Sequence, residues 1–304
     1  MTAAMEPAAA LAATTPVSTR GPAGLAWRRF RRHRMAMVGL VTLGVIVVAA
    51  LLADVIAPHH PNEVDLAAFR QAPSAEHWLG TDSAGRDVFA RLLHAGRISL
   101  GVGIAASLIS VAIGTLLGAV AGLFRGWADT VIMRTADIML SFPALVVIIV
   151  VAGVLGPSVV TLVLAMGVFG WPAAGRVVRG VTLSVREREF VKAARSFGAG
   201  GWWLITRHLV PAALGPVTVV ATLGVAQAIM AEATLSFLGL GVEPPAASWG
   251  NMLTDAQNLT LISSMPWMWL PPGIAVALTV LAVNFVGDGL RDALDPRTTL
   301  GALR

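Results

Sequence analysis

Long apolar runs separated by short polar segments dominate the hydropathy pattern of this chain. An α-helix needs about 20 apolar residues to cross roughly 30 Å of hydrocarbon, and most of the runs approach that length. The pattern therefore predicts an all-α integral membrane protein with six transmembrane helices. The predicted spans are Met35–Val55, Ile98–Leu123, Val131–Leu155, Val159–Ala174, Val210–Ala231 and Leu270–Val286.

Composition supports a membrane location. Hydrophobic residues account for 56% of the 304 residues and charged residues for only 13%, whereas soluble proteins carry roughly 25% charged residues. The chain has no cysteine, which excludes disulfides, zinc-thiolate sites and thiol nucleophiles. Its net charge of +5 comes mostly from arginines beside apolar runs, and this placement favours a role in membrane topology over nucleic-acid binding.

The segments outside the spans divide the chain further. Residues 1–24 are rich in Ala, Thr and Pro without periodicity, which predicts a disordered tail. The other predicted divisions are a basic juxtamembrane segment with the first span at 25–57, an outer loop at 58–97, a core at 98–289 and a tail at 290–304. The core contains an inner loop at about 176–209 and an outer loop at about 239–269.

Lysine and arginine are distributed unevenly between the two sides of the predicted bundle. With the N-terminus inside, all but four of the 22 Lys and Arg residues lie on inner segments. Positively charged segments remain in the cytoplasm, so we expect both termini to be cytoplasmic. The four outer residues are Arg70, Arg86, Arg91 and Arg97.

The inner loop contains the signals of a short, capped helix. Ser184 and Glu187 have the S-x-x-E spacing of a capping box, which starts a helix because it satisfies two free backbone donors. The helix is expected to run from Val185 to Phe197. It should end at Gly198, since glycine tolerates the positive φ of a helix stop.

Small side chains on this predicted helix favour close approach by another surface. Ala193 and Ala194 are adjacent, and Gly198 follows four residues after Ala194. Two interpretations are open, a helix resting on lipid headgroups and a helix that docks on a protein. The capped start, the glycine stop and the mixed charge favour docking. The charged residues around the small ones are Arg186, Glu187, Arg188, Glu189, Lys192 and Arg195.

The segment VKAARSFGAGGWWLITRHLVPAA resembles the EAA loop of ABC importer permeases. Lys192 stands where that family most often has Glu, so a family-type ion pair at this position does not carry over. The positions that match the family pattern are Ala193, Ala194, Gly198, Leu209 and Pro211.

Five further segments resemble the C-type permease of dipeptide, oligopeptide and nickel importers. They occur in the family's order and, with the EAA-like loop, span nearly the whole chain beyond residue 25. The segments are RRFRRHRMAMVGL, LGTDSAGRDVFARLLHAGRISLGVG, RTADIMLSFPALV, EATLSFLGLGVEPPAASWGNML and NFVGDGLRDALDPR.

This resemblance implies the type I ABC importer permease fold, in which one chain forms half of a pore and a cytoplasmic coupling helix sits in a cleft of an ATPase. It implies a B-type permease partner, two ABC ATPase subunits, an extracytoplasmic substrate-binding protein and contact with membrane lipid in the cytoplasmic membrane of a prokaryote. Short peptides are the implied cargo, with nickel and glutathione as alternatives. The residues implied in the ATPase-coupling loop are Glu187, Glu189, Lys192, Ala193, Ala194, Arg195 and Gly198.

We expect no ATPase activity from the chain itself. A Walker A loop requires Gly-Lys followed by Ser or Thr, and the only lysine, Lys192, follows Val191. ATP and Mg²⁺ are therefore expected on partner subunits, with no catalytic residue, cofactor or metal site in this chain. An ion-coupled secondary transporter would need a buried carboxylate deep in a span, and an intramembrane hydrolase would need paired catalytic side chains. The mid-span positions are almost all apolar, which disfavours both.

A few residues in or near the spans are candidates for pore lining or helix packing. Arg134 and Asp137 are three apart, a spacing that allows a self-neutralising pair. Gln227 and Asn284 could line a pore or bond a neighbouring helix. Gly114 and Gly118 form a small-xxx-small pair, which predicts close helix packing within the subunit.

Two groups of aromatic residues have simple interpretations. Trp249, Trp267 and Trp269 are placed as an aromatic belt at a membrane interface would place them. His59 and His60 invite a nickel-binding interpretation, but two adjacent histidines on a loop are a weak signal, and no metal site is predicted.

Overall fold

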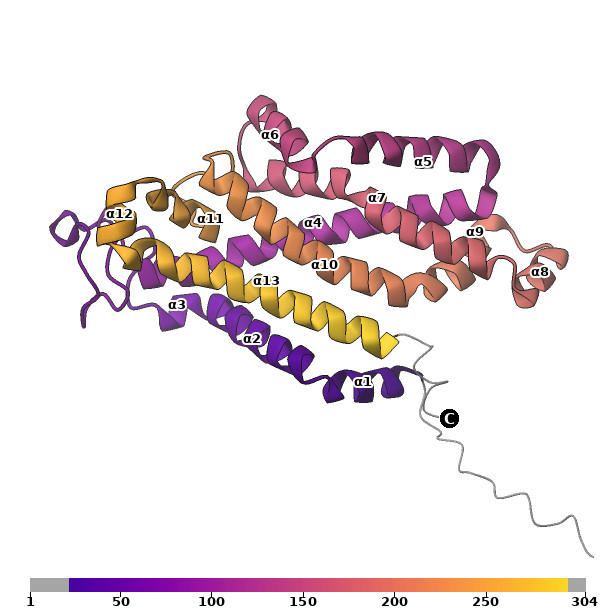
Figure 1. Cartoon of the computed structure of the whole chain (residues 1–304), viewed down its shortest axis with the longest axis horizontal. Helices are drawn as coiled ribbons and strands as arrows, with labels where there is room; N and C mark the ends of the chain where they lie inside the picture. The colour runs from indigo at the N-terminus through magenta and orange to yellow at the C-terminus, as the bar shows by residue number, and fades with distance from the viewer. Residues whose placement is uncertain (1–21, 295–304) are drawn as a thin grey trace, which may run out of the picture.

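The computed structural model describes residues 22–294, which form an elongated helical bundle (Figure 1). Five long apolar helices can cross a membrane, and a bent pair, α5 and α6, makes six if it counts as one span. The prediction of an all-α membrane protein is confirmed. The long helices are α2 (Arg34–Leu51), α4 (Val88–Phe124), α7 (Val159–Val185), α10 (Val210–Phe237) and α13 (Pro266–Leu294), and the bent pair is α5 (Gly126–Ser141) and α6 (Ala144–Leu155).

Short elements lie at both ends of the bundle. In Figure 1, α1, α8 and the C-terminal end of α13 lie at the right-hand end, whereas α11 and α12 lie at the opposite end. A π-helical turn, Ile205–Leu209, joins α9 to α10 without a break. The short helices are α1 (Pro22–Arg32), α3 (Ala53–Ile56), α8 (Glu189–Ser196), α9 (Gly201–Leu204), α11 (Trp249–Met252) and α12 (Leu259–Ser264), with 3₁₀ turns at Leu66–Ala68 and Leu253–Gln257.

The most extensive helix contact joins α4 to α7. Gly114 and Gly118 of α4 face α7, and a Cβ on Gly114 would lie 2.6 Å from the Cβ of Ala174 and 2.7 Å from the Trp171 carbonyl oxygen. The small-xxx-small pair therefore packs helices within the chain, as predicted, because only glycine lets the two backbones approach this closely.

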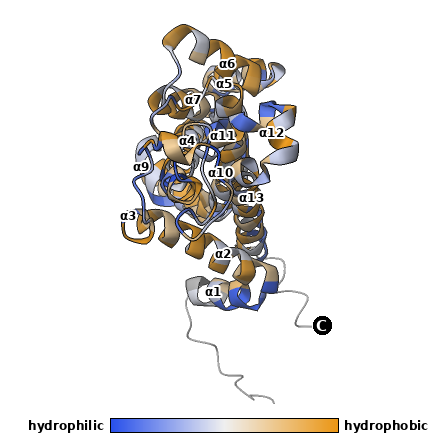
Figure 2. Cartoon of the chain, turned by 90° about the vertical axis from the view of Figure 1, so that its left-hand side faces the viewer, coloured by the Kyte–Doolittle hydropathy of each residue, from blue (hydrophilic) through white to orange (hydrophobic). Residues whose placement is uncertain are grey.

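The remaining long helices are layered from this pair. α10 contacts α4, α7 and α13, and α2 packs against both α13 and α4. Here too a glycine marks close approach, since a Cβ on Gly39 of α2 would lie 2.6 Å from the Ala282 carbonyl oxygen of α13. Figure 2 shows apolar residues over α2 and α6 and hydrophilic residues on α1. The outward surface of the bundle is thus suited to lipid.

The third predicted span is not one straight helix. α5 ends at Ser141, α6 begins at Ala144, and the two are bent by 86°. The break falls at Phe142 and Pro143, where Phe142 has extended backbone angles of φ −101° and ψ 142°. Proline disfavours helical angles at the residue before it and cannot donate a backbone hydrogen bond, so the prediction of a continuous Val131–Leu155 helix was wrong.

Several helices extend beyond the apolar runs that predicted them. α4 begins at Val88, ten residues inside the predicted outer loop, and α13 covers Pro266–Leu294. α7 continues to Val185, so the segment between the end of α7 and the start of α9 is 186–200 rather than about 176–209. Residues 22–24 of the predicted disordered tail belong to α1; residues 1–21 and 295–304 lie outside the described residues.

The α4–α7 contact yields a stability prediction. Gly114→Ala should destabilise the folded protein by about 1–3 kcal/mol, because overpacking at a tight contact forces the helices apart. The control is Gly101→Ala in the same helix, where a Cβ would have nothing within 4 Å. Thermal unfolding of the purified chains in detergent would measure the difference, and equal melting temperatures for the two variants would contradict a tight α4–α7 contact at Gly114.

Candidate functional site

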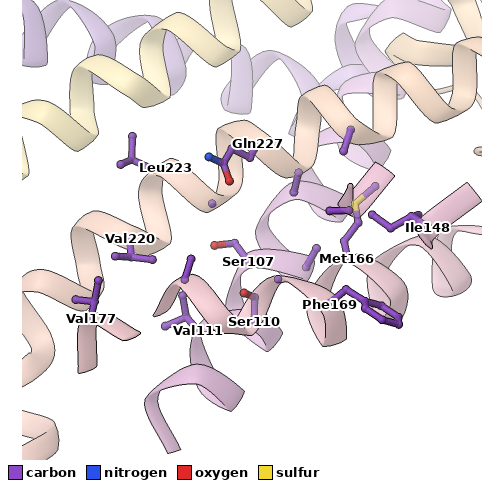
Figure 3. A pocket seen from close by; sticks show the side chains of 17 residues that line it. Ser107, Ser110, Val111, Ile148, Met166, Phe169, Val177, Val220, Leu223 and Gln227 are labelled. Carbon is purple, nitrogen blue, oxygen red and sulfur yellow. The ribbon is translucent and has the colours of Figure 1, made fainter. Parts of the chain in front are cut away.

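A cavity of about 320 Å³ lies among α4, α6, α7 and α10. Figure 3 shows Ser107, Ser110 and Gln227 as its labelled polar side chains, while the other labelled residues are apolar. No Asp, Glu, Lys or Arg is among the described residues that line it. The cavity can therefore surround a neutral solute or an uncharged part of one, but it offers no fixed charge to select a charged solute.

Two glycines that line the cavity, Gly170 and Gly224, lie against its two serines. A Cβ on Gly170 would lie 2.9 Å from the Ser110 hydroxyl oxygen, and one on Gly224 would lie 2.8 Å from that of Ser107. The Ser107 hydroxyl donates to the Ala221 carbonyl oxygen at 2.8 Å, which joins α4 to α10 beside the cavity. Ser107 and Ser110 were not predicted, although their three-residue spacing on a small-residue helix places them on one face.

The predicted polar residues fall in different places. Gln227 is exposed and borders the cavity, which fits the pore-lining alternative. Asn284 lies half-buried on α13, outside the set of residues that line the cavity. The functional role of either residue remains a prediction.

Two ion pairs connect α5 to α7. Arg179 donates to both carboxylate oxygens of Asp129, at 2.6 and 2.7 Å. Arg176 donates to Asp137 at 2.7 Å, whereas Arg134 lies 4.0 Å from the same carboxylate. The predicted Arg134–Asp137 pair is therefore secondary to an interhelix pair. The sequence could not reveal Arg176 as the partner because it lies 39 residues away.

The short helix α8 ends as predicted but begins differently. Gly198 has a φ of +85°, and its N–H and that of Ala199 donate to the carbonyl oxygens of Arg195 and Ala194, each at 3.0 Å. These two bonds form a Schellman stop. The predicted Ser184–Glu187 capping box is wrong, since Ser184 lies within α7 and the residue before α8 is Arg188, which makes no side-chain capping bond.

Packing explains why α7 continues through the predicted helix start. Thr182 and Val185 are buried, and the Thr182 side chain lies against Gly122 of α4. Arg186 then donates to the carbonyl oxygens of Gly122 and Leu123 at 3.1 and 3.0 Å, at the end of α4. These long-range contacts outweigh the local capping signal, so the helical stop moves beyond Ser184.

One face of α8 is packed, and the other is open. Val191 is only 1% exposed and belongs to an apolar cluster that includes Ala119 of α4, Val178 of α7 and Leu209 and Ala213 at the start of α10. Of the residues predicted to couple to an ATPase, Ala194 is half-buried. Phe197, beside them, is 92% exposed. The other predicted coupling residues, Glu187, Glu189, Lys192, Ala193, Arg195 and Gly198, are exposed.

Lys192 has a local partner in place of a family-type ion pair. Its ammonium lies 3.3 Å from Glu187, which also lies 3.3 Å from Arg186. The hydrogen bond from Lys192, with the attraction of its charge, lowers the pKa of the Glu187 carboxyl below its ordinary value. Because both side chains are exposed, the pair contributes little to the stability of the fold. Glu187 also offsets the charge of Lys192, which leaves α8 with a nearly balanced charge.

At the opposite end of the bundle, a buried carboxyl joins three elements. Glu232 of α10 is 0% exposed and accepts hydrogen bonds from Ser99 of α4 at 2.9 Å and from Ser236 at 2.7 Å. Each serine oxygen in turn accepts a backbone N–H of the outer loop, from Trp249 and from Val242, both at 3.1 Å. No local pattern in the sequence indicated this network.

Trp249 does not belong to an aromatic belt. Its side chain is only 2% exposed, and its indole N–H donates to the Leu92 carbonyl oxygen at 3.0 Å. The helix α11 that carries it therefore folds back against α4 rather than lying on lipid headgroups. Trp267 and Trp269 are partly exposed, as an interfacial residue would be.

Comparison with known proteins identifies the class. Residues 114–300 match the family described as binding-protein-dependent transport system inner membrane component, and residues 21–73 match the N-terminal TM domain of oligopeptide transport permease C. The chain belongs to this family of ABC importer permeases, within its oligopeptide permease C branch.

Relatives from several bacteria are similar to this chain over nearly its whole length. A Brucella suis protein named as a candidate peptide permease is 47% identical over 285 residues, 94% of each chain. The glutathione transport system permease protein GsiD of Escherichia coli is 42% identical over 283 residues, 93% of each chain. Its counterpart in Pectobacterium atrosepticum is 40% identical over 293 residues, 95% of this chain and 97% of the relative.

The buried carboxyl network can be tested by mutation. Glu232→Ala should destabilise the protein by about 2–3 kcal/mol, because two buried serine hydroxyls lose their acceptor, and should speed amide hydrogen exchange over residues 239–257. Glu232→Gln should lose less stability than Glu232→Ala, since the amide oxygen still accepts from one serine and the amide NH₂ can donate to the oxygen of the other. The control is Glu243→Ala in the exposed part of the same loop. Equal exchange rates in Glu232→Ala and Glu243→Ala would contradict this role.

Proposed function

We propose that this chain is the C-type permease subunit that forms half of the translocation pore of an ATP-driven importer of short peptides. The observation that carries the proposal is the apolar cluster between α8 and the pore helices. Val191 of α8 packs in one cluster with residues of α4, α7 and α10, and these helices line the cavity. A force applied to α8 from outside therefore acts directly on three of the helices that enclose the cavity.

In this proposal the force comes from ATPase subunits. The chain lacks a Walker A sequence, so ATP and Mg²⁺ bind to two partner ABC ATPases and this subunit is not an enzyme. The exposed residues of α8 and the protruding Phe197 sit in an ATPase cleft. Closure of the ATPases on ATP displaces α8, and the attached helices rock as rigid bodies to alternate access to the cavity.

A second, B-type permease completes the pore. Gln227 and Leu223 border the cavity and are exposed, so the cavity is open along part of its wall. α5 and α6 also carry exposed large apolar side chains, including Val131, Ile138 and Val146. A partner permease that covers the open side would enclose a pathway, while lipid covers the remaining apolar surface.

The orientation follows from the position of the positive charge. α1 and α8 lie at the same end of the bundle as the C-terminal end of α13 (Figure 1), and α1 alone carries Arg28, Arg29, Arg31 and Arg32. By the positive-inside rule this end faces the cytoplasm of a prokaryote, where ATPases can reach α8. The outer-loop end, with α11 and α12, then faces the extracytoplasmic substrate-binding protein.

Short peptides are the proposed cargo, and glutathione or nickel are the alternatives. The uncharged cavity favours a solute whose main chain can exchange hydrogen bonds with serine and amide groups. Relatives named for peptide transport and for glutathione transport support both organic cargoes. An ion-coupled secondary transporter is less well supported, because the buried carboxyl of Glu232 is held in a serine network that joins structural elements.

Reconstitution of the complex in liposomes would test the proposed function. ATP-dependent uptake of a labelled dipeptide, delivered by the cognate binding protein, is expected, with labelled glutathione and Ni²⁺ as parallel arms. Saturable uptake of glutathione or Ni²⁺ alone would show that the cargo is not a peptide, and would still support the permease role. Uptake driven by a proton gradient without ATPase subunits would overturn the permease role.

Docking of α8 gives a prediction about one exposed side chain. Phe197→Ala should reduce the affinity for the ATPase subunits at least about tenfold, because buried aromatic side chains dominate interface energies, and should leave the melting temperature of the isolated chain unchanged. Co-purification of ATPase subunits at graded concentrations would measure it.

The matched control for Phe197 is Leu259→Ala. Leu259 is 82% exposed but lies on α12 at the opposite end of the bundle. Wild-type ATPase retention by Phe197→Ala, or an equal loss in both variants, would argue against docking through α8.

The cavity gives a second prediction for this function. Ala173 of α7 is exposed and lines the cavity, so Ala173→Trp should fill it and reduce uptake by at least about tenfold while ATPase subunits still co-purify. Leu164→Trp is the control, because Leu164 is an exposed residue nine positions away and therefore on the opposite face of α7. Unchanged uptake by Ala173→Trp would contradict a transport path through this cavity.

A further inference from the structure

Three side chains at the outer-loop end form a cluster that the transport mechanism does not use. His59 follows α3, His77 lies in the middle of the loop, and Asp87 directly precedes α4. One potential ligand atom from each residue lies within 4.8 Å of those of the other two. The two imidazole rings are tilted against each other with centroids 4.8 Å apart. The sequence drew attention only to the adjacent pair His59 and His60. In the folded loop, His59 instead lies beside His77 and the Asp87 carboxylate.

Hydrogen bonds already orient both rings. The His59 Nε2 lies 3.0 Å from the Glu76 carbonyl oxygen, which can only accept, so Nε2 carries the proton and Nδ1 holds a free lone pair. The His77 Nδ1 lies 2.9 Å from the Asp87 Oδ2. His59 therefore has the usual arrangement of a metal-ligating imidazole, in which a carbonyl oxygen holds the second ring nitrogen. The His77–Asp87 hydrogen bond brings a second imidazole nitrogen and a carboxylate oxygen to the same place.

The cluster is also rigid and accessible. His77 is 7% exposed and Asp87 is 3% exposed, and the second Asp87 oxygen accepts from the Ala90 N–H at 2.7 Å, which fixes the carboxylate plane. His59 is half-buried, so the cluster has an open side toward solvent. Arg86, next to Asp87 in the sequence, has its own partner, because its guanidinium donates to Asp82 at 2.8 Å.

We propose that His59, His77 and Asp87 bind a first-row divalent transition-metal ion of the Zn²⁺ type. Two imidazoles and a carboxylate are a donor set that suits Zn²⁺ better than Mg²⁺ or Ca²⁺, which require mainly oxygen ligands. The His77 Nδ1 and Asp87 Oδ2 lie 2.9 Å apart, and two ligands of one tetrahedral Zn²⁺ lie about 3.4 Å apart, so these two atoms have to separate only slightly to bind one ion. When the ion binds between these two atoms, the His77 proton moves from Nδ1 to Nε2, so that Nδ1 and the Asp87 Oδ2 become ligands, and His59 supplies its free Nδ1 after a small side-chain movement.

The bound ion would link the start of the outer loop to the start of α4. His59, His77 and Asp87 come from three separate points between residues 59 and 87, so one ion closes two successive loops. Cross-linking of this kind stabilises the folded loop because it restricts the unfolded chain. The site is structural, and it does not depend on the cargo proposed for the importer.

Zn²⁺ binding to the full-length chain in detergent would test the proposal. The chain should carry no histidine tag, since it has only six histidines and no cysteine and a tag would mask the site. Competition with a chromophoric Zn²⁺ chelator would give the stoichiometry and affinity, and thermal unfolding with and without Zn²⁺ would give an independent readout. Mg²⁺ serves as the ion control.

The variants distinguish this site from adventitious binding. His59→Ala should lower Zn²⁺ affinity at least about tenfold and abolish the Zn²⁺-dependent rise in melting temperature. His60→Ala is the matched control, because His60 is adjacent and exposed but lies outside the cluster, with its Nδ1 accepting from the Asn62 N–H at 3.3 Å. The expected result is one Zn²⁺ per wild-type chain and per His60→Ala chain.

Either of two results would overturn the proposal. One is the absence of a saturable 1:1 Zn²⁺ site in the wild type, and the other is equal Zn²⁺ affinity in His59→Ala and His60→Ala. If His59→Ala fails to fold, His59→Gln at the same half-buried position provides the test with the same expected loss. X-ray absorption at the zinc edge should detect two imidazole ligands in the wild type, and a spectrum without imidazole scattering would also refute the site.

Discussion

α4 and α7 lie backbone against backbone because Gly114 and Gly118 present no side chain to the opposing helix. In lipid there is little hydrophobic driving force between helices, so close packing through small residues is a main source of their association. The rest of the bundle is arranged around this contact. α10 lies against both helices, α13 packs on α10, and α2 packs on α13 and α4. The cavity also depends on the pair, since it lies where α10 and α6 approach them.

Polar interactions fix the two ends of the bundle, where apolar packing alone leaves the loops free. At one end Glu232 accepts hydrogen bonds from the hydroxyls of Ser99 and Ser236, and the oxygens of these serines accept backbone N–H groups of the outer loop. At the other end Arg186 caps the carbonyl groups that end α4, and Arg179 binds Asp129 through both carboxylate oxygens. Buried polar groups are costly unless they are paired, so each network has a defined geometry. Between these ends the helix contacts are mostly apolar, with the Ser107–Ala221 hydrogen bond as a polar contact beside the cavity.

The short helix α8 combines two properties that a coupling element needs. Val191 anchors it in the apolar cluster shared by α4, α7 and the start of α10, while Phe197 and the charged residues face outward. The Schellman stop at Gly198 then turns the chain toward α9. In the proposed function, a displacement at the outward face would move the anchored face and so link ATPase closure to the cavity.

Features that depend on local pattern could be predicted from the amino-acid sequence. The apolar runs indicated the spans, and Gly198 indicated the end of α8, because run length and a positive-φ glycine act through neighbouring residues. Features that depend on distant partners were set by tertiary contacts. Packing against Gly122 carried α7 through Ser184, despite its capping signal. The bond from Trp249 to Leu92 buried a residue expected at the membrane interface. Asp137 paired with Arg176 and His59 lay beside His77 because folding brought together residues far apart in the chain, and no local pattern encodes such contacts.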